Sequence, residues 1–280
     1  MSIVQAIVQG VIQGLTEFLP VSSSGHLILG SRLLGLPEPG LSFSISLHVG
    51  TGLAVLIMLR SELSWLIAAI VSPGEKYQRR RALQLMSYVV LASIPAALTG
   101  IVFSGLIEPL FSSSAVASVG LIVTGLVLRF GKGSPEPTDR RRRDGARVEY
   151  QRDMPSVTLG SACLVGLAQA VAIVPGISRS GITIAAGLMS GITRQDAARF
   201  SFLLSLPAVF GAALLDLRSL GETGLPLITV NSFVGALVSS IVGVFALGTV
   251  FRTVRQGRLS AFSYYCFAVG TVSLMWLLLS

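Results

Sequence analysis

The sequence predicts an all-α polytopic membrane protein with six transmembrane helices and two re-entrant helical hairpins, arranged as an inverted-topology repeat. Three observations lead to this fold class: an apolar composition, long uninterrupted apolar stretches, and two apolar segments that are broken by polar residues. The chain has 280 residues, of which 52% are hydrophobic and only 12% are charged, and its mean hydropathy is +0.77. Such values are typical of proteins whose solvent is the lipid bilayer.

Six apolar stretches are long enough to cross a hydrocarbon core of roughly 30 Å. They lie at about 43–59, 82–106, 114–130, 200–217, 230–251 and 259–279. Membrane spans are helices or closed barrels, and these stretches are continuously apolar rather than alternating, so we expect helices. The two cysteines, Cys163 and Cys266, lie in apolar segments, and we expect both to be small core residues.

The net charge of +8 comes from the segments between the spans. Most of the 21 Lys and Arg residues lie in four of them, at 60–82, 129–156, 194–199 and 252–258. We read the first of these as a loop. Because the charge gathers in connections between spans, we expect no nucleic-acid partner. Cytoplasmic loops are enriched in Lys and Arg, so all four segments should lie on the cytoplasmic side.

This charge bias predicts the course of the two broken segments. The apolar segment 156–191 is broken at 174–181 and basic at both ends, so it should enter from the cytoplasm and return there. The apolar first 34 residues, broken at 20–25, should then dip in from the outside. Both chain ends are therefore expected on the external side.

An internal repeat accompanies the broken segments. Five residues of the first segment recur 156 positions later. The pairs are Gln13 and Gln169, Ser22 and Ser178, Ser24 and Ser180, Gly25 and Gly181, and Ile28 and Ile184, and Phe43-Ser44 and Phe200-Ser201 follow at nearly the same offset. We expect one membrane domain over 1–280, with repeats at about 1–131 and 157–280 and a cytoplasmic loop at 132–156. Inverted repeats of this kind place their binding site near the membrane midplane.

One face of the first helix is polar. Gln5, Gln9, Gln13 and Glu17 are spaced by four residues, which places them in one stripe. A carboxylate at bilayer depth costs about 2.5 to 3.5 kcal/mol, so Glu17 should face protein or water and have a functional role. The glutamines fit equally well as hydrogen-bonding groups that hold helices together.

Each break is followed by the sequence of a helix start. The chain reads Ser-Ser-Ser-Gly-His at 22–26 and Ser-Arg-Ser-Gly at 178–181. Helix N-termini attract anions through unpaired N–H groups and the helix dipole. Arg179 adds a guanidinium that can bind a phosphate through a bidentate fork. Two such helix starts meeting near the midplane predict a phosphate or diphosphate site.

A carboxylate among anion-binding groups indicates a bridging divalent cation. Mg²⁺ or Ca²⁺ held by Glu17 and substrate oxygens would remove the repulsion between carboxylate and phosphate, and would neutralise charge as a phosphoryl group leaves. His26 follows Ser22 by four residues and Ser23 by three, so it could reach a serine hydroxyl as a base or receive the phosphoryl group itself. The nucleophile is left open between Ser23, His26 and water.

Other polar residues have simpler explanations. The segment 193–196, Thr-Arg-Gln-Asp, has the pattern of a helix cap. His48 and Asp216 fit either as groups that support the site or as helix-to-helix hydrogen bonds. The arginines at 140–143 are expected in a solvated loop near anionic lipid headgroups.

Two segments resemble the signature segments of the bacitracin-resistance undecaprenyl-diphosphate phosphatase family. They are Gln13-Gly-Leu-Thr-Glu-Phe-Leu-Pro-Val-Ser-Ser-Ser-Gly-His26 and Pro175-Gly-Ile-Ser-Arg-Ser-Gly-Ile-Thr183. The likeness extends over nearly the whole chain. It implies hydrolysis of undecaprenyl diphosphate to the monophosphate lipid carrier at the outer face of the bacterial plasma (inner) membrane, with a divalent metal. It also implies a role in cell-wall carrier recycling and bacitracin resistance.

The resemblance also implies roles for individual residues. The catalytic or phosphate-binding positions fall on Glu17, Ser23, His26 and Arg179. The candidate substrate-binding residues lie in the same two segments and are Ser22, Ser24, Gly25, Gly176, Ser178, Ser180 and Thr183. Glu17 and Gln13 are the candidate metal ligands. Some family members have glutamate where this chain has Gln13, and because an amide is a poorer ligand we expect a lower metal affinity.

An alternative function belongs to a different class. Opposed hairpins in an inverted repeat are also transporter architecture, so the alternative is a transporter or flippase of polyprenyl phosphate. A pure carrier needs only positively charged groups that bind the phosphate, and neither a nucleophile nor a metal-binding carboxylate. This chain has the phosphate-binding groups and also the candidate nucleophile and carboxylate. A purely structural scaffold gives no reason for Glu17, His26 and Arg179 at the breaks. The oligomeric state is left open, with a homodimer among the alternatives.

Overall fold

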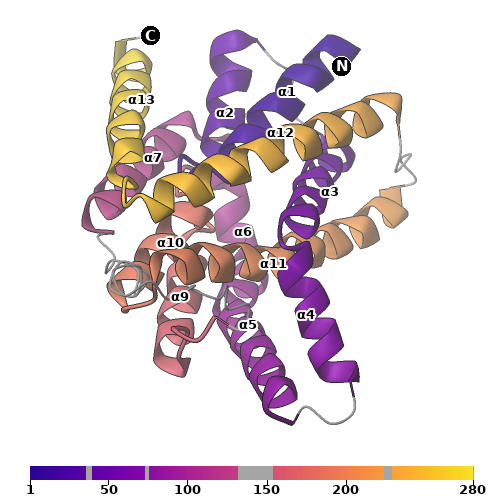
Figure 1. The fold of residues 1–280 in the computed structure, drawn as a ribbon. Coiled ribbons are helices and arrows are strands. Elements are labelled where there is room, and N and C mark those ends of the chain that lie inside the picture. The colour runs from indigo at the N-terminus through magenta and orange to yellow at the C-terminus, as the bar shows by residue number, and fades with distance from the viewer. Residues whose placement is uncertain (36–39, 73–75, 132–153, 224–228, 280) are drawn as a thin grey trace.

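The computed structural model describes residues 1–35, 40–72, 76–131, 154–223 and 229–279, and within these ranges the chain forms helices and their connections (Figure 1). The helices are α1 (Ile3–Thr16), α2 (Ser23–Leu34), α3 (Leu41–Met58), α4 (Arg60–Val71), α5 (Lys76–Val102), α6 (Ser104–Ile107), the 3₁₀-helix η1 (Glu108–Ser112), α7 (Ser114–Phe130), α9 (Leu159–Val171), α10 (Arg179–Met189), α11 (Arg194–Thr223), α12 (Val230–Arg255) and α13 (Ser260–Leu279). The predicted all-α fold class is confirmed.

Among the described residues, four helices are long and apolar enough to cross a membrane, namely α5, α11, α12 and α13. Two bent pairs raise the number to six if each counts as one span. These are α3 with α4, bent by 71°, and the α6–η1 segment with α7, bent by 98°. The chain is therefore a polytopic membrane protein, as predicted, while the count of six spans stays a prediction.

The reading of 60–82 as a loop is wrong. Most of this segment is helical, because Arg60–Val71 forms α4 and α5 begins at Lys76. The charges of α4 lie in its first turn, and the apolar residues after them supply Leu66 and Ala69 to the core. The buried Glu62 carboxylate lies 3.4 Å from Nε of Arg199, which ties α4 to α11. The segment predicted to be a basic loop therefore contains a helix, because its apolar residues pack into the core.

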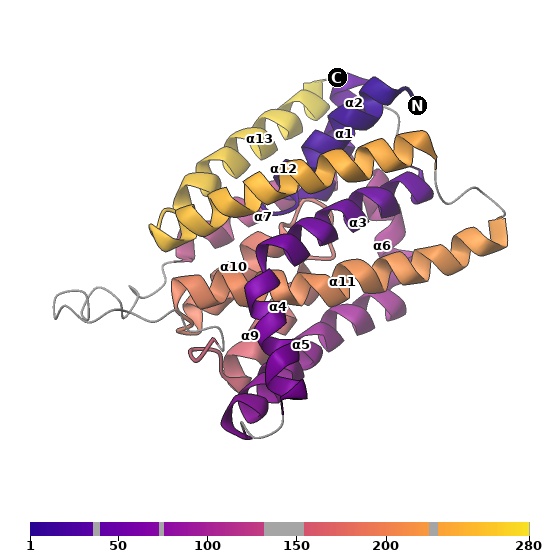
Figure 2. The same ribbon diagram turned by 45° about the vertical axis from the view of Figure 1, so that its right-hand side comes forward.

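The two broken segments form two hairpins, α1 with α2 and α9 with α10. In both views the first hairpin lies at the end of the molecule that carries the two termini, and the second lies towards the opposite end (Figures 1 and 2). Around them α12 packs against α1 and α3, α13 packs against α7, and α5 packs against α9. Helix α10 contacts α7, α9 and α11, so it lies at the centre of the helix assembly.

Small residues bring α1 close to α12. A Cβ atom added at Gly14 would lie 2.7 Å from the Ser239 carbonyl oxygen, and one added at Gly10 would lie 2.9 Å from that of Gly235. Helices in membranes commonly associate through such small-residue contacts, because backbones can then approach closely. This contact orients α1 so that Gln9 is buried.

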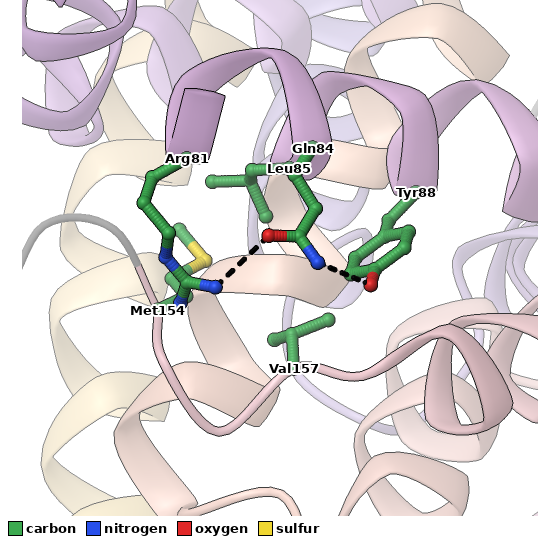
Figure 3. A pocket seen from close by; sticks show the side chains of 6 residues that line it. All are labelled: Arg81, Gln84, Leu85, Tyr88, Met154 and Val157. Carbon is green, nitrogen blue, oxygen red and sulfur yellow. Dashed lines mark hydrogen bonds between the residues drawn. The ribbon is translucent and has the colours of Figure 1, made fainter. Parts of the chain in front are cut away.

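The chain enters α9 beneath the first turns of α5 (Figure 3). Nη1 of Arg81 donates a hydrogen bond to Oε1 of Gln84 over 3.0 Å, and Nε2 of Gln84 donates to the Tyr88 hydroxyl over 2.7 Å. Met154 and Val157 lie opposite these side chains. Because this hollow has almost no free volume for a ligand, it is not the candidate functional site.

The expectations for the cysteines have different outcomes. Cys266 is buried, as predicted, whereas Cys163 is exposed and its predicted core position is wrong. Cys163 shares an outer face of α9 with the exposed Leu164 and Leu167. In a membrane protein an apolar neighbourhood is typical of the lipid-facing surface as well as the core, which is why composition misplaced this residue.

Three remaining expectations concern polar residues outside the breaks. The backbone N–H of Asp196 donates to Oγ1 of Thr193 over 3.4 Å, in agreement with a helix cap. Nδ1 of His48 lies 2.9 Å from the Ser44 carbonyl oxygen one turn earlier in α3. The side chain of Asp216 lies outside the described part of the chain, as do residues 132–153 with the arginines at 140–143.

Candidate active site

Both breaks end in a capped helix start. Ser22 caps α2, and its Oγ accepts a hydrogen bond from the Gly25 N–H over 3.3 Å. Ser178 caps α10 in the same way, accepting from the Gly181 N–H over 3.1 Å. These caps confirm the predicted helix starts. A cap satisfies only part of the first turn, so each break keeps backbone N–H groups that can bind an anion.

The backbone at the breaks has unusual conformations. Ser22 has a φ of 69°, a left-handed value that costs a non-glycine residue about 1 to 3 kcal/mol. Gly176 has a φ of 86°, and a Cβ atom there would lie 2.8 Å from the backbone carbonyl carbon of Ala117. Position 176 therefore requires glycine. Strained backbone of this kind is typical of functional sites, where the surrounding fold holds it in place.

Hydrogen bonds join the two breaks. The Gly176 N–H donates to Oγ of Ser24 over 3.4 Å, and the Ser180 hydroxyl donates to the Leu19 carbonyl over 3.4 Å. Thr124 of α7 supports the second break, because its hydroxyl donates to the Gly176 carbonyl over 3.1 Å. The same hydroxyl oxygen accepts the backbone N–H of Ser178 over 2.9 Å. The two helix starts thus meet, as their sequences predicted.

The Glu17 carboxylate is the centre of the site. It follows the last residue of α1 and is only 8% exposed. One oxygen, Oε1, pairs with Nη2 of Arg179. The other, Oε2, accepts the Ser23 hydroxyl over 2.7 Å and Nε2 of Gln13 over 3.0 Å. Glu17 therefore joins the polar stripe of α1 to the start of α2 and to the start of α10.

Helix α11 holds the Arg179 side of the site. Nη1 of Arg179 donates to the Ser205 carbonyl over 3.4 Å. The Thr183 hydroxyl donates to the Arg179 carbonyl over 2.7 Å and lies 2.6 Å from Oγ of Ser201. The Arg179 side chain keeps 20% of its surface exposed, so protein holds its guanidinium while part of the side chain stays accessible.

His26 faces away from the serine hydroxyls. Its Nδ1 lies 2.8 Å from the Ser22 carbonyl oxygen, and its Nε2 lies 2.8 Å from the hydroxyl of Tyr265 on α13. The two rings stack, with centroids 5.7 Å apart and planes within 8°. A carbonyl oxygen only accepts, so Nδ1 carries the hydrogen and a neutral ring accepts the Tyr265 O–H at Nε2. The prediction that His26 reaches a serine hydroxyl as its base is not what the structure shows, because Ser23 donates to Glu17 instead.

The residues around Glu17 fit a hard divalent cation. Oε1 of Gln13 is buried without a hydrogen-bond partner in the described part of the chain, and its amide nitrogen fixes it beside the Glu17 carboxylate. Magnesium and calcium take oxygen ligands, and magnesium commonly uses one or two protein groups together with water and substrate phosphate. Within the described ranges no group of three or more His, Cys, Asp or Glu side chains could hold a metal alone. The protein therefore offers few oxygen ligands for a cation, and the oxygens of a substrate phosphate would supply the others.

The structure brings most of the predicted residues together. Gln13, Glu17, Ser23 and Arg179 form one hydrogen-bonded cluster. The other predicted binding residues line the two joined helix starts or the first turn of α10, and they are Ser22, Ser24, Gly25, Gly176, Ser178, Ser180 and Thr183. His26 belongs to the same start of α2, but its ring nitrogens are directed elsewhere.

Four supporting residues were missed from the sequence: Thr124, Ser201, Ser205 and Tyr265. The repeat contained a signal for Ser201, because Phe200-Ser201 matches Phe43-Ser44. No comparable pattern marked Thr124 or Tyr265, whose neighbours are apolar. Ser205 takes part through its backbone carbonyl, which no side-chain pattern can reveal.

Known proteins match the chain over nearly its full length. The family model described as "Bacitracin resistance protein BacA" matches residues 6–272. A protein named undecaprenyl-diphosphatase from Trichlorobacter lovleyi is 44% identical over 96% of this chain and 95% of its own. Proteins of the same name from Desulfosudis oleivorans and Desulforapulum autotrophicum are 41% and 40% identical, and each alignment covers 98% of both chains. The chain therefore belongs to the bacitracin resistance protein BacA family.

Proposed function

We propose that this protein is an undecaprenyl-diphosphatase, which hydrolyses undecaprenyl diphosphate to undecaprenyl monophosphate and inorganic phosphate. The names of its relatives support this activity. The observation that carries it is the Ser23–Glu17–Arg179 cluster at the joined helix starts. A hydroxyl, a carboxylate that can accept its proton, and a guanidinium for phosphate oxygens are there in direct contact. Recycling of the cell-wall lipid carrier and bacitracin resistance follow from this activity.

Ser23 is the nucleophile in this proposal, because its hydroxyl already donates to Oε2 of Glu17 over 2.7 Å. Ser23 Oγ attacks the terminal phosphorus while Glu17 accepts the hydroxyl proton. The bond between that phosphorus and the bridging oxygen breaks, and the lipid monophosphate leaves with the bridging oxygen. Water then attacks the phosphoserine, which releases inorganic phosphate and restores the hydroxyl.

Arg179 exchanges partners during this reaction. Without substrate its guanidinium pairs with Glu17, so the positive charge of Arg179 is engaged by the carboxylate. The terminal phosphate of the substrate offers oxygens that suit the same guanidinium fork. When Arg179 moves to the phosphate, Glu17 becomes free to take the Ser23 proton. Ser205 keeps the guanidinium near both partners through its backbone carbonyl.

Gln13 and Glu17 are the residues that would hold a divalent cation, Mg²⁺ or Ca²⁺. When bound, such an ion supplies positive charge that neutralises the phosphate oxygens as the phosphoryl group transfers. The buried, unpartnered Oε1 of Gln13 supports this assignment. Because one of the two ligands is a neutral amide, the affinity should depend strongly on substrate phosphate.

The orientation in the bacterial inner membrane follows from charge. Arg252 and Arg255 on the last turn of α12, and Arg258 in the turn that follows, lie at the end of the molecule opposite both termini (Figure 2). We place this turn in the cytoplasm, both termini outside and the site open to the outer face. Alkaline phosphatase fused to the C-terminus should be active in cells, and an inactive fusion would reverse the orientation.

Phosphate release by the purified protein is the direct test. Long-chain polyprenyl diphosphate would be supplied with Mg²⁺, with Ca²⁺ and with chelator. Release with either metal, and its loss with chelator, is the expected result. Full release in chelator would remove the metal from the proposal. No release under any condition would favour the alternative, a carrier of polyprenyl phosphate.

Changing Tyr265 to phenylalanine should lower kcat about three- to ten-fold with little change in KM. The ring stacking is kept, but Nε2 of His26 loses its donor, and one neutral hydrogen bond contributes about 1 kcal/mol. His26 contacts the Ser22 carbonyl through Nδ1, next to Ser23, so Tyr265 would be a positioning residue that acts through His26 on the start of α2. Nitrogen NMR of the imidazole should show a changed Nε2 signal in this variant. Tyr264→Phe is the matched control, and an equal loss of kcat there would argue against a specific role for the His26 contact.

A further inference from the structure

A polar cavity lies away from the candidate active site, and we call it the arginine cavity. Its volume is about 290 Å³. Arg129, Arg194 and Ser260 supply its polar wall, and Leu128, Leu188 and Val254 are among its apolar lining. It lies at the ends of α7, α10 and α12 and the starts of α11 and α13. Arg179 and Leu188 are nine residues apart on α10, so the two sites are separated by roughly 14 Å of helix.

The charge of the arginine cavity selects an anion. Of the described side chains that line it, only Arg129 and Arg194 are charged, and both are positive. The lining also includes the Ser260 hydroxyl, which can donate a hydrogen bond. Two guanidinium groups and a hydroxyl around a small cavity match the oxygens of a phosphate group.

Both arginines are held in position. Nη1 of Arg129 donates to the Tyr264 hydroxyl over 3.0 Å, and its guanidinium lies 5.3 Å from the centroid of the Tyr264 ring. The Arg194 guanidinium lies against Gly257, whose φ is 70°, and a Cβ atom there would be 2.7 Å from Cζ of Arg194. These contacts order the two guanidinium groups in advance, which reduces the entropy lost when a ligand binds.

The surroundings favour a lipid as the source of the phosphate. Phe130, the residue after Arg129, is 62% exposed, and Tyr264 is 61% exposed. Exposed aromatic side chains beside arginines are typical of the membrane interface, where rings meet acyl chains and guanidinium groups meet phosphates. We propose that the arginine cavity binds the phosphate group of an anionic membrane phospholipid, with its acyl chains beside Phe130 and Tyr264. This site is separate from the proposed diphosphatase reaction and does not depend on it.

The test is a titration of the full-length protein in detergent, followed by native mass spectrometry. The probes are phosphatidylglycerol, phosphatidylcholine and inorganic phosphate. We expect saturable binding of phosphatidylglycerol, weakened about ten-fold by Arg129→Gln and by Arg194→Gln, because each removes a charge-assisted contact. Gly257→Ala should weaken it too, since it displaces Arg194 without changing the net charge. Arg255→Gln is the matched control, because Arg255 is exposed on the last turn of α12 outside the cavity lining.

Each contrary result has a definite meaning. An equal loss in Arg255→Gln would show diffuse surface charge rather than a site and would overturn the proposal. So would phosphatidylcholine binding as tightly as phosphatidylglycerol. Tighter binding of inorganic phosphate would replace the lipid with free phosphate. Arg179→Ala should leave phosphatidylglycerol binding unchanged, and a loss there without a loss in Arg129→Gln would place the lipid in the candidate active site.

Discussion

Replacing Arg179 by alanine is expected to reduce kcat/KM for polyprenyl diphosphate by about a thousand-fold or more. The guanidinium is the positive protein group in the cluster around Glu17 and Ser23, and it is held towards them from α11. Arginines that stabilise the charge of a transferring phosphoryl group contribute about 10³ to 10⁵ in rate. The variant also leaves the Glu17 carboxylate without its counter-charge, so phosphate would meet an unshielded negative group. Phosphate release at several substrate concentrations measures the effect.

Two further variants show whether the loss is specific. Arg179→Lys keeps the charge but loses the planar fork, so its activity should lie between those of wild type and the alanine variant. Arg141→Ala removes a charge from the segment 132–153 and should change the rate little. Size-exclusion chromatography in detergent should show folded protein in every case. Near-normal turnover in Arg179→Ala would refute the site assignment, and a large loss in Arg141→Ala would refute the view of that segment as a solvated loop.

Changing Glu17 to glutamine is expected to lower kcat by about a hundred-fold or more. The amide keeps the size of the side chain but cannot take the Ser23 proton, and general bases contribute about 10² to 10⁴ in rate. Removing this negative charge also leaves Arg179 free for phosphate, so KM should stay the same or fall. A large drop in kcat without a rise in KM would therefore show that Glu17 acts in the chemical step, as the base or through the cation, rather than in substrate binding.

The metal dependence of this variant gives a second, independent result. Stimulation by Mg²⁺ or Ca²⁺ should be weakened, because one of the two proposed oxygen ligands becomes a neutral amide. Glu108→Gln makes the same chemical change at an exposed position on η1 and should behave like wild type. If Glu17→Gln kept wild-type kcat with full metal stimulation, both the base and the metal assignment would be wrong.

Much of the fold and the centre of the site could be predicted from the sequence, because the bilayer restricts what a chain can do. Long apolar runs must become helices, and polar interruptions in them must be buried in protein, which is why the breaks after α1 and α9 were recognisable. The charge of Glu17 and Arg179 at such depth singled them out before any contact was known. Their pairing across 162 residues agrees with the meeting of helix starts that the repeat predicted.

Other features were decided only by the tertiary structure. The segment after α3 is a helix because its apolar residues pack against the core. The basic residues of the segment did not indicate this packing. Cys163 lies on the surface because lipid and core accept the same side chains. Thr124, Ser205 and Tyr265 contact the site from helices that lie far along the chain. Thr124 and Tyr265 lie in apolar sequence, where polar residues do not recur at a regular spacing. The orientation of the His26 ring depends on Tyr265, whose hydroxyl is the hydrogen-bond partner of Nε2. Only the packing of α2 against neighbouring helices places this partner within 3 Å.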